Sequence, residues 1–156
     1  MPLTRPALAV ALAAASLLTS CTASLERTGY RHTQGPYTVQ VSHPRWVSGP
    51  HLSVDVTLTN AGGPTVTHPM PTEDRECGLN TAPLQNVQTG EQVRPMPEPR
   101  SGGCQTDALV LQLEPGQTVQ HRFWYSVRGV PTGVYSLALD LPPEFAAPEI
   151  EVEVRH

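Results

Sequence analysis

Apolar and polar residues alternate with a period of two along much of the chain. The segment 51–60 shows this most clearly, because every second residue is apolar (Leu52, Val54, Val56 and Leu58) and the residues between them are polar. Side chains on a β-strand point alternately to opposite faces of the sheet. The pattern therefore predicts a strand with one buried face and one exposed face.

Further segments of the same kind recur about every 10 to 15 residues, with turn-forming residues between them. They span residues 37–43, 65–68, 84–87, 107–113, 118–127, 133–141 and 149–156. No segment after the first twenty residues shows the 3.6-residue period of a helix. The sequence predicts an all-β domain, an antiparallel Ig-like β-sandwich of about seven strands.

One local motif supports this fold class. In "PTGVYSL", Tyr135 follows Gly133 by two residues, which resembles the tyrosine corner of Greek-key sandwiches. In that motif the tyrosine hydroxyl bonds back to nearby backbone before a core strand. Tyr135 is therefore expected to have a structural role.

The first twenty residues have the layout of a secretory signal. Arg5 precedes the uncharged apolar run 7–18. A helix of that length spans about 18 Å, too short for a hydrocarbon core of about 30 Å. We expect a signal peptide over 1–20, a polar tether over 21–35 and the Ig-like domain over 36–156.

The leader ends in Leu18, Thr19, Ser20 and Cys21, which resembles the lipobox of bacterial lipoproteins. This resemblance implies cleavage before Cys21 and acylation of that residue, so that the lipid bilayer becomes a partner. A plain secretory signal is the alternative. The expected location is the cell envelope: the outer membrane if the source has one, otherwise the outer face of the cytoplasmic membrane.

Cys77 and Cys104 are then an even pair in an exported domain. A disulfide between them would contribute about 3 to 4 kcal/mol by loop-entropy arithmetic. It would also hold together two segments that are rich in proline and glycine. Free thiols or metal ligation are the alternatives.

Composition excludes several classes of function. The net charge is −4, and all ten cationic side chains are arginine. Without lysine there is no Schiff base and no phosphate-loop lysine. The common nucleophile, zinc, calcium and dinucleotide motifs are absent as well. We expect no enzyme activity, no cofactor and no nucleic-acid partner.

Two kinds of candidate binding residue remain. His68, Met70 and Met96 lie in the proline-rich stretches "HPMP" and "RPMP", and imidazole with thioethers suits Cu(I); packing of these residues is the simpler interpretation. The preferred contact segment is an acidic loop, because sandwich proteins often bind through loops. It comprises Pro71, Thr72, Glu73, Asp74, Arg75 and Glu76.

The order of landmarks from residue 52 to residue 141 resembles the BsuPI-type bacterial proteinase inhibitor family. The matching motifs are "VDVTLTN" ending at Asn60, "TGEQV" with Gly90 and Glu91, "LEPGQT" with Pro115 and Gly116, and "PTGVYSL" with Gly133 and Tyr135. The resemblance implies an Ig-like sandwich and, as a possible activity, inhibition of a proteinase. It places no inhibitory residue.

Together these observations predict a non-catalytic envelope lipoprotein whose Ig-like module binds a partner or has a structural role. The expected partners are the bilayer, through Cys21, and an envelope protein or a protease. A BsuPI-like proteinase inhibitor is the first alternative. A copper carrier using His68, Met70 and Met96 is the second.

Overall fold

Every regular element that the structure describes is a β-strand. The computed structural model describes residues 26–98, 104, 109–146 and 149–156. The strands are β1 (Arg27–Gln34), β2 (Tyr37–Pro44), β3 (Trp46–Val47), β4 (His51–Asn60), β5 (Val66–Met70), β6 (Leu79–Asn80), β7 (Leu84–Asn86), β8 (Gln92–Val93), β9 (Leu109–Leu113), β10 (Thr118–Ser126), β11 (Gly133–Ala138) and β12 (Glu149–Val154).

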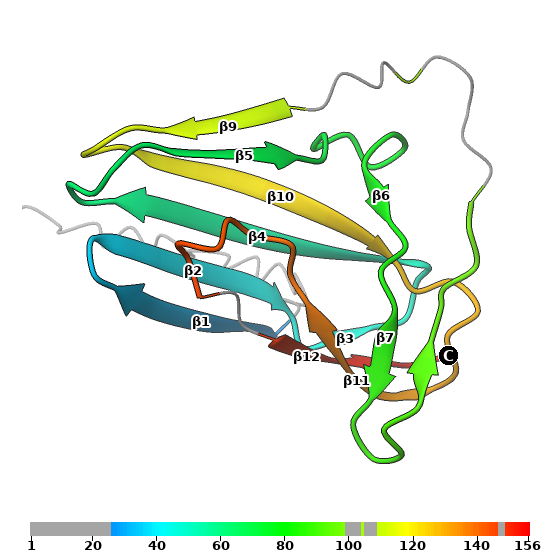
Figure 1. Ribbon diagram of the computed structural model, residues 1–156. Coiled ribbons are helices and arrows are strands. Elements are labelled where there is room, and N and C mark those ends of the chain that lie inside the picture. Colours follow the sequence, from blue (N-terminus) through cyan, green and yellow to red (C-terminus); the bar gives the residue numbers. More distant parts are fainter. Residues whose placement is uncertain (1–25, 99–103, 105–108, 147–148) are drawn as a thin grey trace, which may run out of the picture.

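The strands form two five-stranded sheets and a two-stranded ribbon (Figure 1). The first sheet has the order β1-β2-β4-β10-β6, and the second has the order β3-β12-β11-β7-β8. β5 and β9 form the ribbon. The pairing of β4 with β10 in one sheet and of β7, β11 and β12 in the other is the B–E and C–F–G arrangement of Ig-like sandwiches. The all-β sandwich expected from the sequence is confirmed.

The core lies between the two sheets and follows the predicted alternation. Residues of β4 alternate between buried and partly exposed along its whole length. Its buried face carries Leu52, Val54, Val56 and Leu58, each no more than 1% exposed. The buried faces of β11 and β12 contribute residues such as Leu137 to the same cluster. Burial of these faces is the main force that holds the sheets together.

The first strand corrects the predicted domain boundary. Residues 27–34 were expected in a polar tether, yet they form β1 and pair with all of β2. A tight turn joins the two strands, and Gly35 there has a φ of 57°, which favours glycine. Because β1 is an edge strand exposed on both faces, it shows no apolar alternation. The domain therefore begins by Arg27, and not at residue 36.

Four strands had no signal in the sequence: β1 and the two-residue strands β3, β6 and β8. Two of the short strands also depart from the expected antiparallel pairing, because β6 runs parallel to β10 and β3 runs parallel to β12. Strands of two residues are too short to show a period of two. β6 is an edge strand of the first sheet, and β3 is an edge strand of the second.

The β5–β9 ribbon covers one side of the core. Val66, Met70, Leu111 and Leu113 of the ribbon are buried. β5 continues through Pro69, where the sequence suggested a break. Proline is tolerated there because β5 pairs only with β9 among the described residues.

Asn60 joins the turns at the base of this ribbon. It is fully buried, and its amide donates to the carbonyls of Gly63, Pro64 and Leu113. Its side-chain oxygen accepts from the backbone N–H of Gly63 at 2.7 Å. Asn60 therefore connects the turn after β4 to the end of β9.

Tyr135 is a core residue of the sandwich. Its side chain is 1% exposed on β11, and a Cβ added at Gly133 would lie 3.3 Å from its ring. Within the described residues its hydroxyl makes no hydrogen bond, so the backbone clamp of a tyrosine corner is not seen in that part of the chain. The glycine's contribution is the room it leaves for the ring.

The expected signal peptide (1–20) and Cys21 lie outside the described residues. In the described part of the chain, no helix is long and apolar enough to span a membrane.

Candidate contact loop at the edge of the first sheet

The predicted contact segment lies along an edge that the first sheet leaves only partly paired. β10 pairs with β4 over nine residues on one side. On its other side it pairs with β6 only at Trp124 and Tyr125. The segment 71–76, here called the contact loop, lies between β5 and β6 in the chain. It contacts β10 at Arg122, two residues before the residues that pair with β6.

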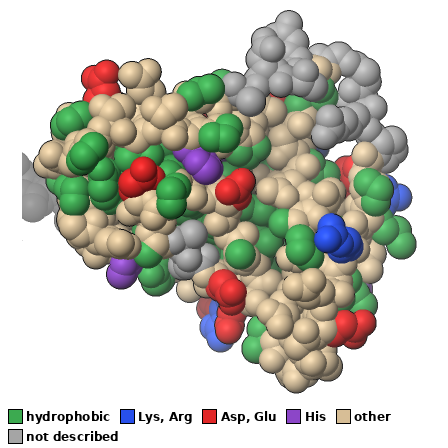
Figure 2. Space-filling view, viewed as in Figure 1, with side chains coloured by type: hydrophobic (Ala, Val, Ile, Leu, Met, Phe, Trp, Pro, Cys, Tyr) green, Lys and Arg blue, Asp and Glu red, His purple; other side chains and the backbone are tan. Residues whose placement is uncertain are grey.

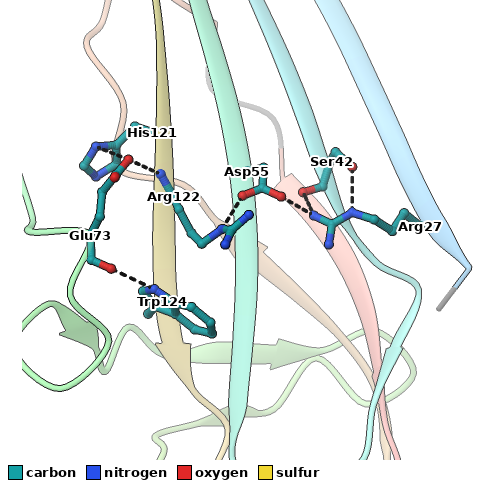
Figure 3. A network of polar contacts seen from close by, with 7 residues as sticks. All are labelled: Arg27, Ser42, Asp55, Glu73, His121, Arg122 and Trp124. Atoms are coloured by element: carbon teal, nitrogen blue, oxygen red, sulfur yellow. Dashed lines mark hydrogen bonds and ion pairs between the residues drawn. The ribbon is translucent and has the colours of Figure 1, made fainter. Parts of the chain in front are cut away.

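Glu73 attaches the contact loop to β10 (Figure 3). Its carboxylate accepts a hydrogen bond from the backbone N–H of Arg122 at 3.0 Å and lies 3.5 Å from Nδ1 of His121. Its backbone carbonyl accepts a bond from Nε1 of Trp124 at 2.9 Å. Within the described residues, Glu73 therefore takes the place of a neighbouring strand for one backbone donor of β10.

A tight turn closes the loop after this attachment. The backbone N–H groups of Cys77 and Gly78 both donate to the carbonyl of Asp74. The Asp74 carboxylate accepts from the N–H of Glu76 at 2.9 Å, a local bond that aspartate commonly makes in turns. A Cβ at Gly78 would collide with the Thr72 carbonyl oxygen, so only glycine fits there. The backbone of the loop is thus specified by its own residues.

A disulfide between Cys77 and Cys104 ties the end of the turn to the segment that leads to β9. The two cysteines are 27 residues apart, and their Cα atoms are separated by 5.4 Å. The predicted disulfide is confirmed. It closes a long loop of irregular chain, the situation in which a crosslink removes the most entropy from the unfolded state.

The tip of the contact loop is exposed. Asp74, Arg75 and Glu76 all face solvent, and the Arg75 guanidinium lies 6.0 Å from the ring centre of Trp124. Of the six predicted contact residues, Glu73 has a different role, because its polar groups hold the loop in place. Glu73 is exposed as well, so the exposed part of the contact loop comprises Glu73, Asp74, Arg75 and Glu76.

A row of ion pairs crosses the outer face of the first sheet and ends at the loop (Figure 3). Arg27 on β1 donates to Asp55 on β4 at 2.7 Å and to Ser42 on β2. Arg122 on β10 donates to the other Asp55 oxygen at 2.6 Å, and this bond raises the pKa of its guanidinium. The row joins β1, β2, β4 and β10, and it runs from Arg27 to Arg122, whose backbone N–H donates to Glu73.

The row borders a shallow hollow of about 600 Å³. Its lining includes Thr57, Gln120, His121 and Trp124. Burial lowers the pKa of His121, although the charge of Glu73 and the backbone of Pro71 oppose this effect. Burial therefore disfavours the charged form of His121.

The remaining candidate residues, His68, Met70 and Met96, differ in their surroundings. His68 lies 3.7 Å from Asp140, and its Nε2 is buried without a hydrogen-bond partner. Met70 is 4% exposed in the core. Met96 is 58% exposed and lies beside Gly129. No group of three or more His, Cys, Asp or Glu side chains in that part of the chain could hold a metal ion.

Charge is spread over the surface. On the face seen in Figure 2, acidic and basic side chains occur singly or in mixed groups, with no broad patch of one sign. This distribution does not favour a long anionic ligand such as a nucleic acid.

Searches against protein families, curated proteins and solved structures returned no match. The function is therefore inferred from the residues and their geometry.

Sequence reasoning located the contact loop but missed what holds it. The sequence did not indicate that the indole N–H of Trp124 donates a hydrogen bond to the loop. Gly78 had one usable signal, because it follows Cys77 at the end of an irregular acidic stretch where a tight turn often needs glycine. Nothing in the sequence indicated that Glu73 would face β10.

Proposed function

We propose that this protein is a cell-envelope lipoprotein, anchored by acylated Cys21, whose sandwich binds an envelope protein through the contact loop without catalysis. The observation that carries the binding role is the set of contacts that attach an exposed tip to the sheet. Three features hold the segment in place: the contacts of Glu73, the turn at Asp74 and the Cys77–Cys104 disulfide. The three residues that follow Glu73 face solvent. A loop ordered before binding loses less conformational entropy when a partner docks.

The charges of the tip indicate the partner's chemistry. Asp74 and Glu76 flank Arg75, and all three are exposed. Complementary charges at an interface favour specificity and orientation more than affinity. The partner is therefore expected to present a basic surface with at least one acidic group.

Proteinase inhibition is supported less well by this loop. An inhibitor that mimics a substrate presents an extended backbone to the protease. Here the chain from Asp74 to Gly78 is a closed turn with two N–H groups bonded to one carbonyl. Copper transport gains no support either, because Met70 is in the core.

The anchor is tested by growing producing cells with radioactive palmitate. The full-length chain should incorporate label, and the variant Cys21→Ser should not. Label in both proteins, or in neither, would refute the anchor.

The binding role is tested by photo-crosslinking in the cell envelope. A photoreactive amino acid at Arg75 should give a discrete protein adduct. The control position is Gln40, which is exposed on β2 in the same sheet. Equal adducts from both positions, or none from Arg75, would contradict binding through the contact loop.

A further inference from the structure

The point at which the chain enters the domain lies at the opposite edge of the sandwich from the contact loop. β1 is the first strand in the order of the first sheet, and β6, next to the loop, is the last. Four strand spacings of about 4.8 Å separate them, or about 19 Å. Figure 1 shows the same separation, with β1 and β6 on opposite sides of β2, β4 and β10.

The tether at this edge is short. β1 begins at Arg27, so five peptide steps connect Cys21 to Glu26. A fully extended chain of that length spans about 18 Å. A domain of about 130 residues has a radius of gyration of about 14 Å. The tether is therefore about as long as the domain's own radius, too short for the domain to turn freely above a membrane.

A distinct group of side chains surrounds this entry point. The anchor-side patch comprises Glu26, Arg45, Trp46, Glu153 and Arg155. The backbone N–H of Arg45 donates to the carbonyl of Glu26 at 2.9 Å, which places β3 beside the start of β1. Trp46 is partly exposed, and the guanidinium of Arg155 lies 5.0 Å from its ring centre.

The charges of the patch are close enough to affect one another. Arg155 donates to Glu153 at 2.7 Å, and this bond lowers the pKa of the Glu153 carboxyl. The charge of Arg45 lowers the same pKa further, and Glu26 raises the pKa of Arg155. A cation therefore lies against the indole ring of Trp46, and carboxylates lie within ion-pair distance of the two arginines of the patch.

We infer that the anchor-side patch rests on the bilayer surface, with Trp46 in the headgroup layer and the contact loop facing away from the membrane. Tryptophan and arginine are residue types that settle at membrane–water interfaces, where an apolar body and a polar group are both accommodated. The inference rests on the proposed lipid anchor at Cys21, because the short tether is what brings the patch to the membrane.

The two tryptophans of the chain provide matched probes of this orientation. The chain contains only Trp46 and Trp124. Trp46 is in the patch, and Trp124 lies beneath the contact loop. Trp124→Phe leaves Trp46 as the only tryptophan, and Trp46→Phe leaves Trp124. The acylated full chain of each variant is reconstituted into phosphatidylcholine–phosphatidylethanolamine vesicles that contain a headgroup-nitroxide lipid.

Nitroxide quenching should be severalfold stronger for the variant that retains Trp46 than for the one that retains Trp124. Equal quenching, or stronger quenching of Trp124, would overturn the orientation. Flotation of the same samples tests the anchor separately, because a chain without lipid would not float with the vesicles. Twelve Gly/Ser residues inserted after Ser24 should reduce quenching of Trp46; unchanged quenching would refute the role of the short tether.

Discussion

The two edges of the first sheet end in different ways. At one edge β1 adds eight regularly paired residues, exposed on both faces, that bury almost nothing. At the other edge β10 keeps only a two-residue partner, and the contact loop covers the adjoining edge through Glu73, Trp124 and a disulfide.

The difference teaches where single residues matter. Along β1, many similar backbone bonds share the stabilisation, so no one side chain is decisive. At the contact loop the same stabilisation depends on a few particular contacts. Substitutions should therefore have large effects at the loop edge and small effects at the β1 edge.

The disulfide should give the largest effect. Replacing Cys77 and Cys104 together with serine is expected to lower the free energy of unfolding by about 3 kcal/mol, because the unfolded chain regains the entropy of a long loop. Urea denaturation of the soluble domain measures this value. A loss below about 1 kcal/mol would contradict the dependence of this edge on its crosslink.

Gly78→Ala should come next, with a loss of about 2 kcal/mol, because a Cβ there meets backbone that cannot move without opening the turn. The matched control is Gly49→Ala. A Cβ at Gly49 meets nothing within 4 Å, so this change should leave stability nearly unaltered. Similar losses from the two variants would show that the tight turn is not a constraint.

Trp124→Phe should cost about 1 kcal/mol, because it removes the indole donor to the Glu73 carbonyl. Hydrogen exchange should become faster at the loop amides of Cys77 and Gly78. Trp46→Phe is the control for loss of an indole at the other edge. If both variants left exchange at these two amides unchanged, the indole bond would not hold the loop.

At the β1 edge, Arg27→Ala should cost only about 0.5 to 1 kcal/mol, since its ion pair with Asp55 is about one-third exposed. Thermal unfolding should show a small shift, and β1 should remain paired with β2 by hydrogen exchange. Loss of β1 protection in this variant would contradict the idea that backbone pairing holds this edge.

The pH dependence should be the smallest of these effects, and it involves both halves of the sheet. Burial lowers the pKa of His43 on β2 and of His121 on β10. Below the unfolded value of about 6.5 the unfolded chain then binds more protons than the folded chain, so stability falls as pH falls. His43→Gln and His121→Gln should each flatten this decline between pH 7 and pH 5, measured by urea denaturation. If the double variant lost stability between pH 7 and pH 5 as steeply as the unmodified protein, this pH dependence would not arise from His43 and His121.

The parts of the fold that the sequence predicted are those in which burial imposes a period. The alternation of 51–60 matches the buried face of β4 residue by residue. β1 was not predicted, because an edge strand with no buried face has no such alternation. The strands β3, β6 and β8 were not predicted because two residues carry no period.

The position of the contact loop could be predicted from the sequence, but the contacts that hold it could not. Its acidic and proline-rich composition marked an irregular segment, and the even pair of Cys77 and Cys104 indicated the crosslink. The attachment through Glu73 depends on which backbone donors of β10 lack a strand partner, and that depends on the whole sheet order. Tertiary pairing of this kind leaves no local signal.

One measurement on the three cysteines tests both the proposed lipid anchor and the disulfide. In the proposed arrangement the lipid is at the β1 edge of the sandwich and the disulfide is at the β6 edge. The measurement is intact and fragment mass spectrometry of the protein isolated from its native membrane. The account predicts a mature chain that begins at acylated Cys21, with Cys77 and Cys104 two hydrogens lighter than free thiols. An unmodified Cys21, a different first residue or a disulfide that includes Cys21 would contradict it.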